Sequence, residues 1–138
     1  MRARVNPASP FARKVRIVLR ERNLMGQIEE VDTAVSPVTP NAELARSNPL
    51  VKIPALILDD GTGVFDSRVI CEYLDMLGHV PRLFPATGTE RWNALRLQSL
   101  CDGILDAGED ATLQVALSNP GSVAATNVQG TLSTSAPG

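Results

Sequence analysis

The strongest constraint on the fold is a short stretch near the middle of the chain. Residues 54–65 read P-A-L-I-L-D-D-G-T-G-V-F, two apolar runs separated by a turn rich in Asp and Gly. This pattern predicts an antiparallel β-hairpin. A stripe of apolar residues at helical spacing follows directly, from Ser67 to a stop at Gly78. A hairpin followed at once by a helix predicts a mixed α/β domain.

The residues before the hairpin alternate between strand and helix signals. An extended start precedes an amphipathic helix over residues 11–23, which Asn23 and Gly26 stop. A short strand over residues 27–31 and a short helix over residues 42–47 follow, and nearby prolines prevent anything longer. The predicted order up to the second long helix is therefore β-α-β-α-β-β-α.

The chain changes character after residue 79. A linker that contains proline leads into another helical pattern over residues 89–107, with Thr89 as the expected cap and Trp92 on the apolar stripe, which places it in a core. Residues 111–138 carry no charged side chain and alternate apolar and polar residues around an N-P-G-S turn. This last stretch predicts a second hairpin.

Composition and charge narrow the classes of function. The chain has 138 residues, 43% hydrophobic and 20% charged, as expected of one soluble globular domain. A net charge of −2 argues against nucleic acid or an anionic membrane as a partner. No apolar run approaches the roughly 20 residues of a membrane-spanning helix, and no secretory signal is present, so a cytoplasmic location is expected. Cys71 and Cys101 lack metal-ligand spacing, so we expect two buried thiols and no metal site.

Ser9 and Pro10 stand at the start of the first helix and allow two interpretations. A serine followed by proline is typical of a helix N-cap, which stabilises a helix by about 1 kcal/mol. The same hydroxyl could donate a hydrogen bond to a bound thiolate, which the partial positive charge of the helix end also favours. Position alone does not separate the two, because both need the side chain at the helix entrance. The basic residues of this helix are expected to form a solvated face, with electrostatic attraction of an anionic ligand as the alternative; they are Arg13, Lys14, Arg16, Arg20 and Arg22.

Three motifs, in this order and spacing, closely resemble those of bacterial glutathione S-transferases. They are S-P-F-A-R-K-V-R from Ser9, N-P-L-V-K-I-P-A-L from Asn48 and F-D-S-R-V-I-C-E-Y-L from Phe65. The resemblance runs over about residues 5–108. It implies an α/β, thioredoxin-like βαβ-α-ββα domain, followed by the first helix of an all-α C-terminal domain.

The resemblance gives Ser9 a catalytic role. Its hydroxyl would polarise the thiol of glutathione and lower the thiol pKa from its usual value of about 8.5 toward neutrality. Phe11, in the same motif, is expected to contact the tripeptide. Ser9 stands where redox relatives of the fold carry the first cysteine of CxxC, and Ala12 where they carry the second. Dithiol reductase chemistry is therefore not expected.

The other two motifs imply binding residues for the tripeptide. Lys52 would lie near the glycyl carboxylate, and Ile53 and Pro54, at a cis-proline turn, would pair with the cysteinyl backbone as an added strand does. Asp66 would face the γ-glutamyl ammonium and Ser67 would bind its carboxylate at a helix N-terminus. The residues alone also permit a solvated lysine, a trans proline that opens an edge strand, and Ser67 as a plain N-cap.

The resemblance also predicts how the chain is divided. Residues 1–79 would form the N-terminal domain, 80–88 a linker and 89–108 the first helix of an incomplete C-terminal domain. Residues 109–138 instead resemble a fragment of an immunoglobulin-like repeat domain. A truncation is therefore expected, with a natural fusion, a frameshift or an assembly error as the origin of the tail.

The function implied is attack of the glutathione thiolate on an electrophile, with glutathione as co-substrate and no metal. The resemblance allows a homodimer and involves neither nucleic acid nor membrane. The electrophile is not predicted, because the segment that would select it is absent. Two alternatives stay open: a non-catalytic interaction protein of the same fold, as stringent-starvation-type relatives are, and a truncated chain that binds glutathione without turnover.

Overall fold

The structure, a computed structural model, describes residues 1–36, 38–39, 41–79, 81–106, 114–117 and 128–131. The chain divides into two compact units, Met1–Gln98 and Ser99–Gly138. The elements follow in the order β1 (Arg2–Val5), α1 (Pro10–Glu21), β2 (Glu29–Asp32), α2 (Ala42–Ser47), β3 (Ala55–Ile57), β4 (Gly63–Val64), α3 (Ser67–Leu77), α4 (Gly88–Asp106), β5 (Gln114–Leu117) and β6 (Val128–Thr131). The mixed α/β class and the order predicted from the sequence are confirmed.

Four strands of the first unit form one mixed sheet in the order β2-β1-β3-β4. The strand β1 runs parallel to β2 and antiparallel to β3, and β3 is antiparallel to β4. The expected hairpin is therefore present. In its turn the backbone N–H of Thr62 donates to Asp60 Oδ1 at 2.8 Å, and this hydrogen bond lowers the pKa of Asp60.

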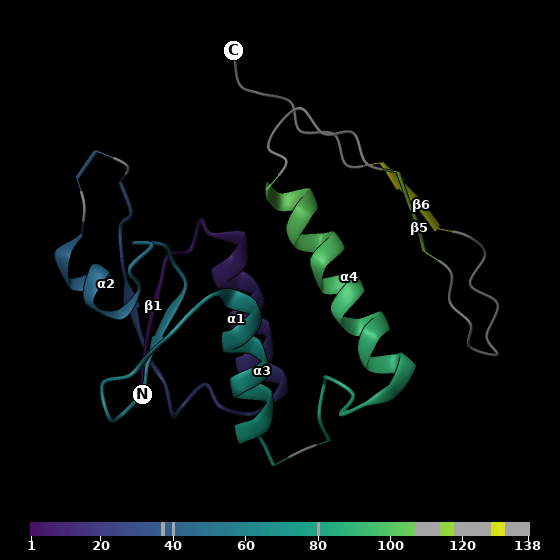
Figure 1. The fold of residues 1–138 in the computed structure, drawn as a ribbon, viewed down its shortest axis with the longest axis horizontal. Helices are drawn as coiled ribbons and strands as arrows, with labels where there is room; N and C mark the ends of the chain where they lie inside the picture. The colour runs from purple at the N-terminus through teal and green to yellow at the C-terminus, as the bar shows by residue number, and fades with distance from the viewer. Residues whose placement is uncertain (37, 40, 80, 107–113, 118–127, 132–138) are drawn as a thin grey trace. The chain divides into compact units, whose positions relative to one another are not determined.

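The two faces of the sheet are covered by different helices (Figure 1). Ala3 and Val5 of β1 and Leu56 of β3 belong to the core, with residues of α1 and α3, which pack against each other. Side chains alternate along a strand, so Arg4 lies on the other face. There its buried guanidinium meets Glu43 of α2 at 3.0 Å. The buried core consists of Ala3, Val5, Ala12, Val15, Val18, Leu19, Leu24, Ile28, Leu56, Ile70, Cys71 and Leu74.

The end of α1 confirms the stop predicted at Asn23. Asn23 adopts a left-handed conformation with φ of 57°. Its N–H donates to the carbonyl of Arg20 at 3.0 Å, and the N–H of Leu24 donates to the carbonyl of Leu19 at 2.8 Å. These two bonds are those of a Schellman motif, and Leu24 enters the core directly after it.

Arg22 corrects the expectation of a fully solvated basic face. Its side chain is 1% exposed, its Nε lies 3.1 Å from Asp75 Oδ1, and its Nη2 donates to the carbonyls of Asp75 and Gly78, both at 2.8 Å. Asp75 in turn accepts from the N–H groups of Leu83 and Phe84. The buried pair therefore ties the segment after α3 to the end of α1. The sequence hides this, because the partners lie more than 50 residues apart.

Three smaller expectations also fail. Trp92 is 70% exposed, because no described element of its unit covers that side of α4. Cys71 is buried as expected, but Cys101 is exposed. The helix α4 begins at Gly88, so Thr89 lies inside it and is not its cap.

In the second unit, β5 and β6 form an antiparallel pair in which Gln114 lies opposite Thr131. The hairpin predicted for this stretch is confirmed as a strand pair, and the N-P-G-S turn itself lies outside the described residues. Within the part of the chain that the structure describes, no helix is both long and apolar enough to cross a membrane.

Candidate functional site

The end of β1 and the start of β3 lie at the same end of the sheet. Arg4 is paired with Ala55 across the antiparallel strands. The chain therefore leaves β1 through Val5 beside the point at which it enters β3 from Pro54. The loop after Val5 leads to Ser9 at the start of α1. The strand register thus brings the first motif and the proline turn to one end of the sheet.

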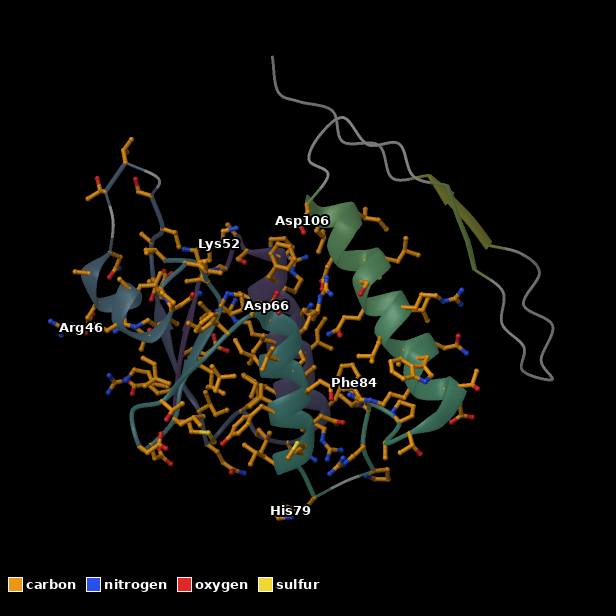
Figure 2. The ribbon with its side chains drawn as sticks, viewed as in Figure 1. Arg46, Lys52, Asp66, His79, Phe84 and Asp106 are labelled. Atoms are coloured by element: carbon orange, nitrogen blue, oxygen red, sulfur yellow. The ribbon has the colours of Figure 1, made fainter. Side chains whose placement is uncertain are left out.

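The end of β4 lies there too. Leu56 is paired with Val64, so the chain leaves β4 toward the end at which β3 begins. Asp66 and Ser67 follow at the start of α3. In Figure 2 the labelled side chains of Lys52 and Asp66 lie toward this end of the sheet, and His79 lies toward the opposite end. The three motifs predicted from the sequence to share a site are therefore brought together.

Ser9 caps α1. Its backbone is extended (φ −77°, ψ 120°), its Oγ accepts a hydrogen bond from the N–H of Ala12 at 3.2 Å, and Pro10 is the first helical residue. The cap interpretation is confirmed by this geometry. A hydroxyl has one donor and two acceptor lone pairs, and the cap uses an acceptor. Capping and donation to a bound thiolate are thus chemically compatible.

Asn6 supports the loop that carries Ser9. The Asn6 Oδ1 accepts from the N–H of Ala8 at 3.0 Å, and its backbone carbonyl accepts from the N–H of Ser9 at 3.0 Å. Its Nδ2 donates to Asp32 Oδ1, at the end of the neighbouring strand β2, at 3.0 Å. These bonds fix the loop between β1 and α1.

The peptide bond between Ile53 and Pro54 is cis, as the resemblance implied, and so is the bond between Phe65 and Asp66. Pro54 is buried at the entrance to β3, Ile53 is half-buried and Lys52 is exposed. A lysine in this position can meet a solvated anion without paying for burial of its own charge.

Asn48 supports this second loop. It is 2% exposed, its Nδ2 donates to the carbonyl of Lys52 at 2.8 Å, and its Oδ1 accepts from the N–H of Leu50 at 3.0 Å. Its backbone N–H donates to Leu44 of α2 at 2.8 Å, and its carbonyl accepts from Val51 at 2.9 Å. The side chain of Asn48 thus bonds the loop before Pro54, while its backbone N–H bonds the end of α2.

The start of α3 shows that Ser67 is not the N-cap of this helix, which was one alternative left open by the sequence. The N-cap is Asp66, whose Oδ1 accepts from the N–H of Arg68 at 2.8 Å, and Ser67 is the first helical residue. Ser67 is buried, with 4% exposure, whereas Asp66 is exposed. Both residue types favour caps, so the sequence could not place the boundary between them.

Helix N-termini give this end of the sheet its electrostatic character. Both α1 and α3 begin here, and each helix start carries partial positive charge and N–H groups without helical partners. Phe11, in the first turn of α1, is half-buried, and Lys14 Nζ lies 5.9 Å from its ring centroid. The site is therefore suited to an anionic ligand.

Asn6 and Asn48 were missed by reasoning from the sequence. Each is followed by a proline, Pro7 and Pro49, and an Asn-Pro pair favours the start of a turn. This shared dipeptide was the signal that could have found both.

A cavity of about 280 Å³ lies away from the three motifs, where β1 begins, with Met1, Arg2 and Asp59 among its lining residues.

Comparison with known proteins identifies the family. Residues 8–77 match the family described as "Glutathione S-transferase, N-terminal domain". A glutathione transferase family member from Pseudomonas fluorescens Pf-5, solved with bound glutathione, is 45% identical with a TM-score of 0.74, and the match covers 77% of this chain and 52% of that one.

Two curated relatives are similar to the same part of the chain. The uncharacterized GST-like protein YibF of Escherichia coli is 35% identical over 72% of this chain and 48% of its own length. The stringent starvation protein A homolog of Pasteurella multocida is 34% identical over 78% of this chain and 51% of its own length. The chain thus spans about half the length of these relatives. Its motifs, its sheet register and these matches agree, and the chain belongs to the glutathione S-transferase family.

Proposed function

We propose that this chain binds glutathione at the end of the sheet where its three motifs converge, and activates the glutathione thiol for attack on an electrophile. The observation that carries the proposal is the strand register, which places the starts of α1 and α3 beside the cis-proline turn before β3. Support also comes from the similar Pseudomonas protein, which was solved with glutathione bound.

In this proposal the tripeptide is held along its length. The Lys52 ammonium meets the glycyl carboxylate, and the backbone of Ile53, set by cis Pro54, pairs with the cysteinyl residue as an added strand does. Ser67 and the N–H groups at the start of α3 bind the γ-glutamyl carboxylate. Asp66 meets the γ-glutamyl ammonium with a carboxylate whose Oδ1 also caps the helix.

Ser9 is the catalytic residue of the proposal. Its O–H donates to the thiolate sulfur while its Oγ lone pair caps α1, and the positive end of the helix stabilises the same anion. Together these lower the pKa of the bound thiol and raise the fraction of thiolate. The sulfur then forms a bond to the electrophilic carbon, and the leaving group departs with the electron pair. Phe11, two residues after Ser9, contacts the tripeptide in this proposal.

The division of the chain follows the same proposal. Residues 1–79 form the glutathione-binding domain, 80–88 the linker, 89–108 the first helix of a second domain, and 109–138 a tail of different origin. A cytoplasmic location, where glutathione is abundant, and a homodimer belong to the proposal as well.

Calorimetric titration with glutathione tests the binding half of the proposal. We expect wild-type protein to bind glutathione, and Asp66→Asn to bind about tenfold more weakly, because it removes a charge that faces an ammonium. His79→Ala is the matched control, since His79 is exposed and lies toward the opposite end of the sheet. A wild-type protein that fails to bind glutathione would refute the proposal.

The second candidate is a non-catalytic interaction protein. The observation that favours it is the similarity to the stringent starvation protein A homolog of Pasteurella multocida. This candidate would be favoured if the protein does not bind glutathione although circular dichroism shows that it is folded. Binding of glutathione without conjugation to a chlorinated dinitroaromatic would instead indicate a binder that does not turn over.

A further inference from the structure

Asn48 is a buried carboxamide that no proposed contact with glutathione uses. It is 2% exposed, and both ends of its amide are engaged with backbone groups of the loop before β3. Removing such a group leaves buried donors and acceptors without partners, which costs more than an exposed hydrogen bond does. Its placement is therefore tightly coupled to the conformation of that loop.

The loop conformation is one that the sequence would not adopt by itself. Val51 has a φ of 53°, in the left-handed region that β-branched residues strongly avoid. Such a conformation persists only where the surroundings fix it. The carboxamide of Asn48 bonds the loop on both sides of Val51: its Oδ1 accepts from the N–H of Leu50 and its Nδ2 donates to the carbonyl of Lys52. The backbone carbonyl of Asn48 also accepts from the N–H of Val51.

We propose that Asn48 is a positioning residue for glutathione, because its carboxamide sets the backbone of Lys52 and so the placement of the Lys52 ammonium and the Ile53 backbone. The inference rests on the proposed function and gives a role to Asn48, which opens the second motif but has no contact of its own with glutathione in that proposal. Asn48 touches no ligand; it acts through Lys52 and Ile53. The start of α1 is held separately by Asn6.

This separation yields a specific test. Asn48→Asp keeps an acceptor for the N–H of Leu50 but removes the donor to the carbonyl of Lys52. We expect its affinity for glutathione to fall about tenfold in calorimetric titration. We expect the pKa of the bound thiol, followed by thiolate absorbance, to stay as in wild type, since Ser9 is held by other contacts. Asn48→Ala, which removes both bonds without burying a charge, serves if the Asp variant does not fold.

Asn41→Ala is the matched control. Asn41 caps the other end of α2, where its Oδ1 accepts from Glu43 and Leu44, so this variant lowers stability without touching the loop. We expect it to bind glutathione as wild type does once folded. Equal affinity of wild type and a folded Asn48 variant overturns this inference alone. Loss of binding in Asn41→Ala as well, or a shift of the bound thiol pKa in the Asn48 variants, also overturns it. Absence of binding in wild type overturns the proposed function together with it.

Discussion

The guanidinium of Arg22 lies directly against Gly78. A Cβ placed on Gly78 would come within 2.7 Å of both Cζ and Nη2 of Arg22. The guanidinium cannot easily move, because it is buried and bonded to the carbonyls of Asp75 and Gly78. The end of α3 therefore requires a residue without a side chain.

Gly78→Ala is expected to destabilise the protein by about 3 kcal/mol, because it displaces a buried charge from its partners. Urea unfolding followed by circular dichroism measures this change. Gly26→Ala is the matched control, since nothing lies within 4 Å of a Cβ at that position. Equal stability of the two variants would show that Arg22 can relocate at little cost.

Val51→Gly is expected to stabilise the protein by about 1 kcal/mol, because glycine adopts a φ of 53° without the steric penalty of a β-branched residue. Part of the gain is offset by the larger entropy of glycine in the unfolded chain. Val64→Gly, at a partly buried position that packs against the core, is the control and is expected to destabilise. A Val51→Gly protein that melts below wild type contradicts the prediction.

Ser9→Gly separates the helix cap that Ser9 makes from its proposed catalytic role. Glycine at an N-cap costs only a few tenths of a kcal/mol relative to serine, so stability is expected to change little. Without the hydroxyl, the pKa of the thiol of bound glutathione is expected to rise by about one unit. A titration of thiolate absorbance measures this change. An unchanged thiol pKa would leave Ser9 as a cap and nothing more.

The lowered pKa of Asp60 leads us to expect that the free energy of unfolding depends on pH. Its pKa is lowered in the folded protein by the hydrogen bonds of Thr62, so it contributes stability above the pKa of the unfolded chain. That contribution is lost as pH falls through the lower folded pKa. Urea unfolding of wild type and Asp60→Asn from neutral to acid pH should therefore show a difference that shrinks below about pH 4. A constant difference over this range counts against it.

Features that depend on neighbouring residues could be predicted from the sequence. The hairpin over residues 54–65, the cap at Ser9 and the stop at Asn23 each follow from local turn and helix chemistry. Features that depend on distant partners could not. Arg22 is buried because Asp75 pairs with it. Trp92 is exposed because no described element of its unit covers it. Neither outcome can be predicted from the residues next to Arg22 or Trp92 in sequence.

The candidate site divides in the same way. The three motifs were located by resemblance, and the cis bond before Pro54 is present, but the roles of the individual site residues stay predictions. The Asn-Pro pairs at Asn6 and Asn48 favour the start of a turn, but they do not indicate which groups the two carboxamides will bond once the loop closes. The sequence could not show whether α3 begins after Asp66 or after Ser67, because both residue types are common helix caps.

The hydrogen bonds that Asn48 makes join an uncharged side chain to uncharged backbone groups. None of these partners titrates, and none is screened by ions. The loop that presents Lys52 should therefore keep its shape across pH and salt concentration. If glutathione binds as proposed, a dependence of its affinity on ionic strength can then be assigned to its own charges and to those of the exposed Lys52 and Asp66, rather than to rearrangement of the loop.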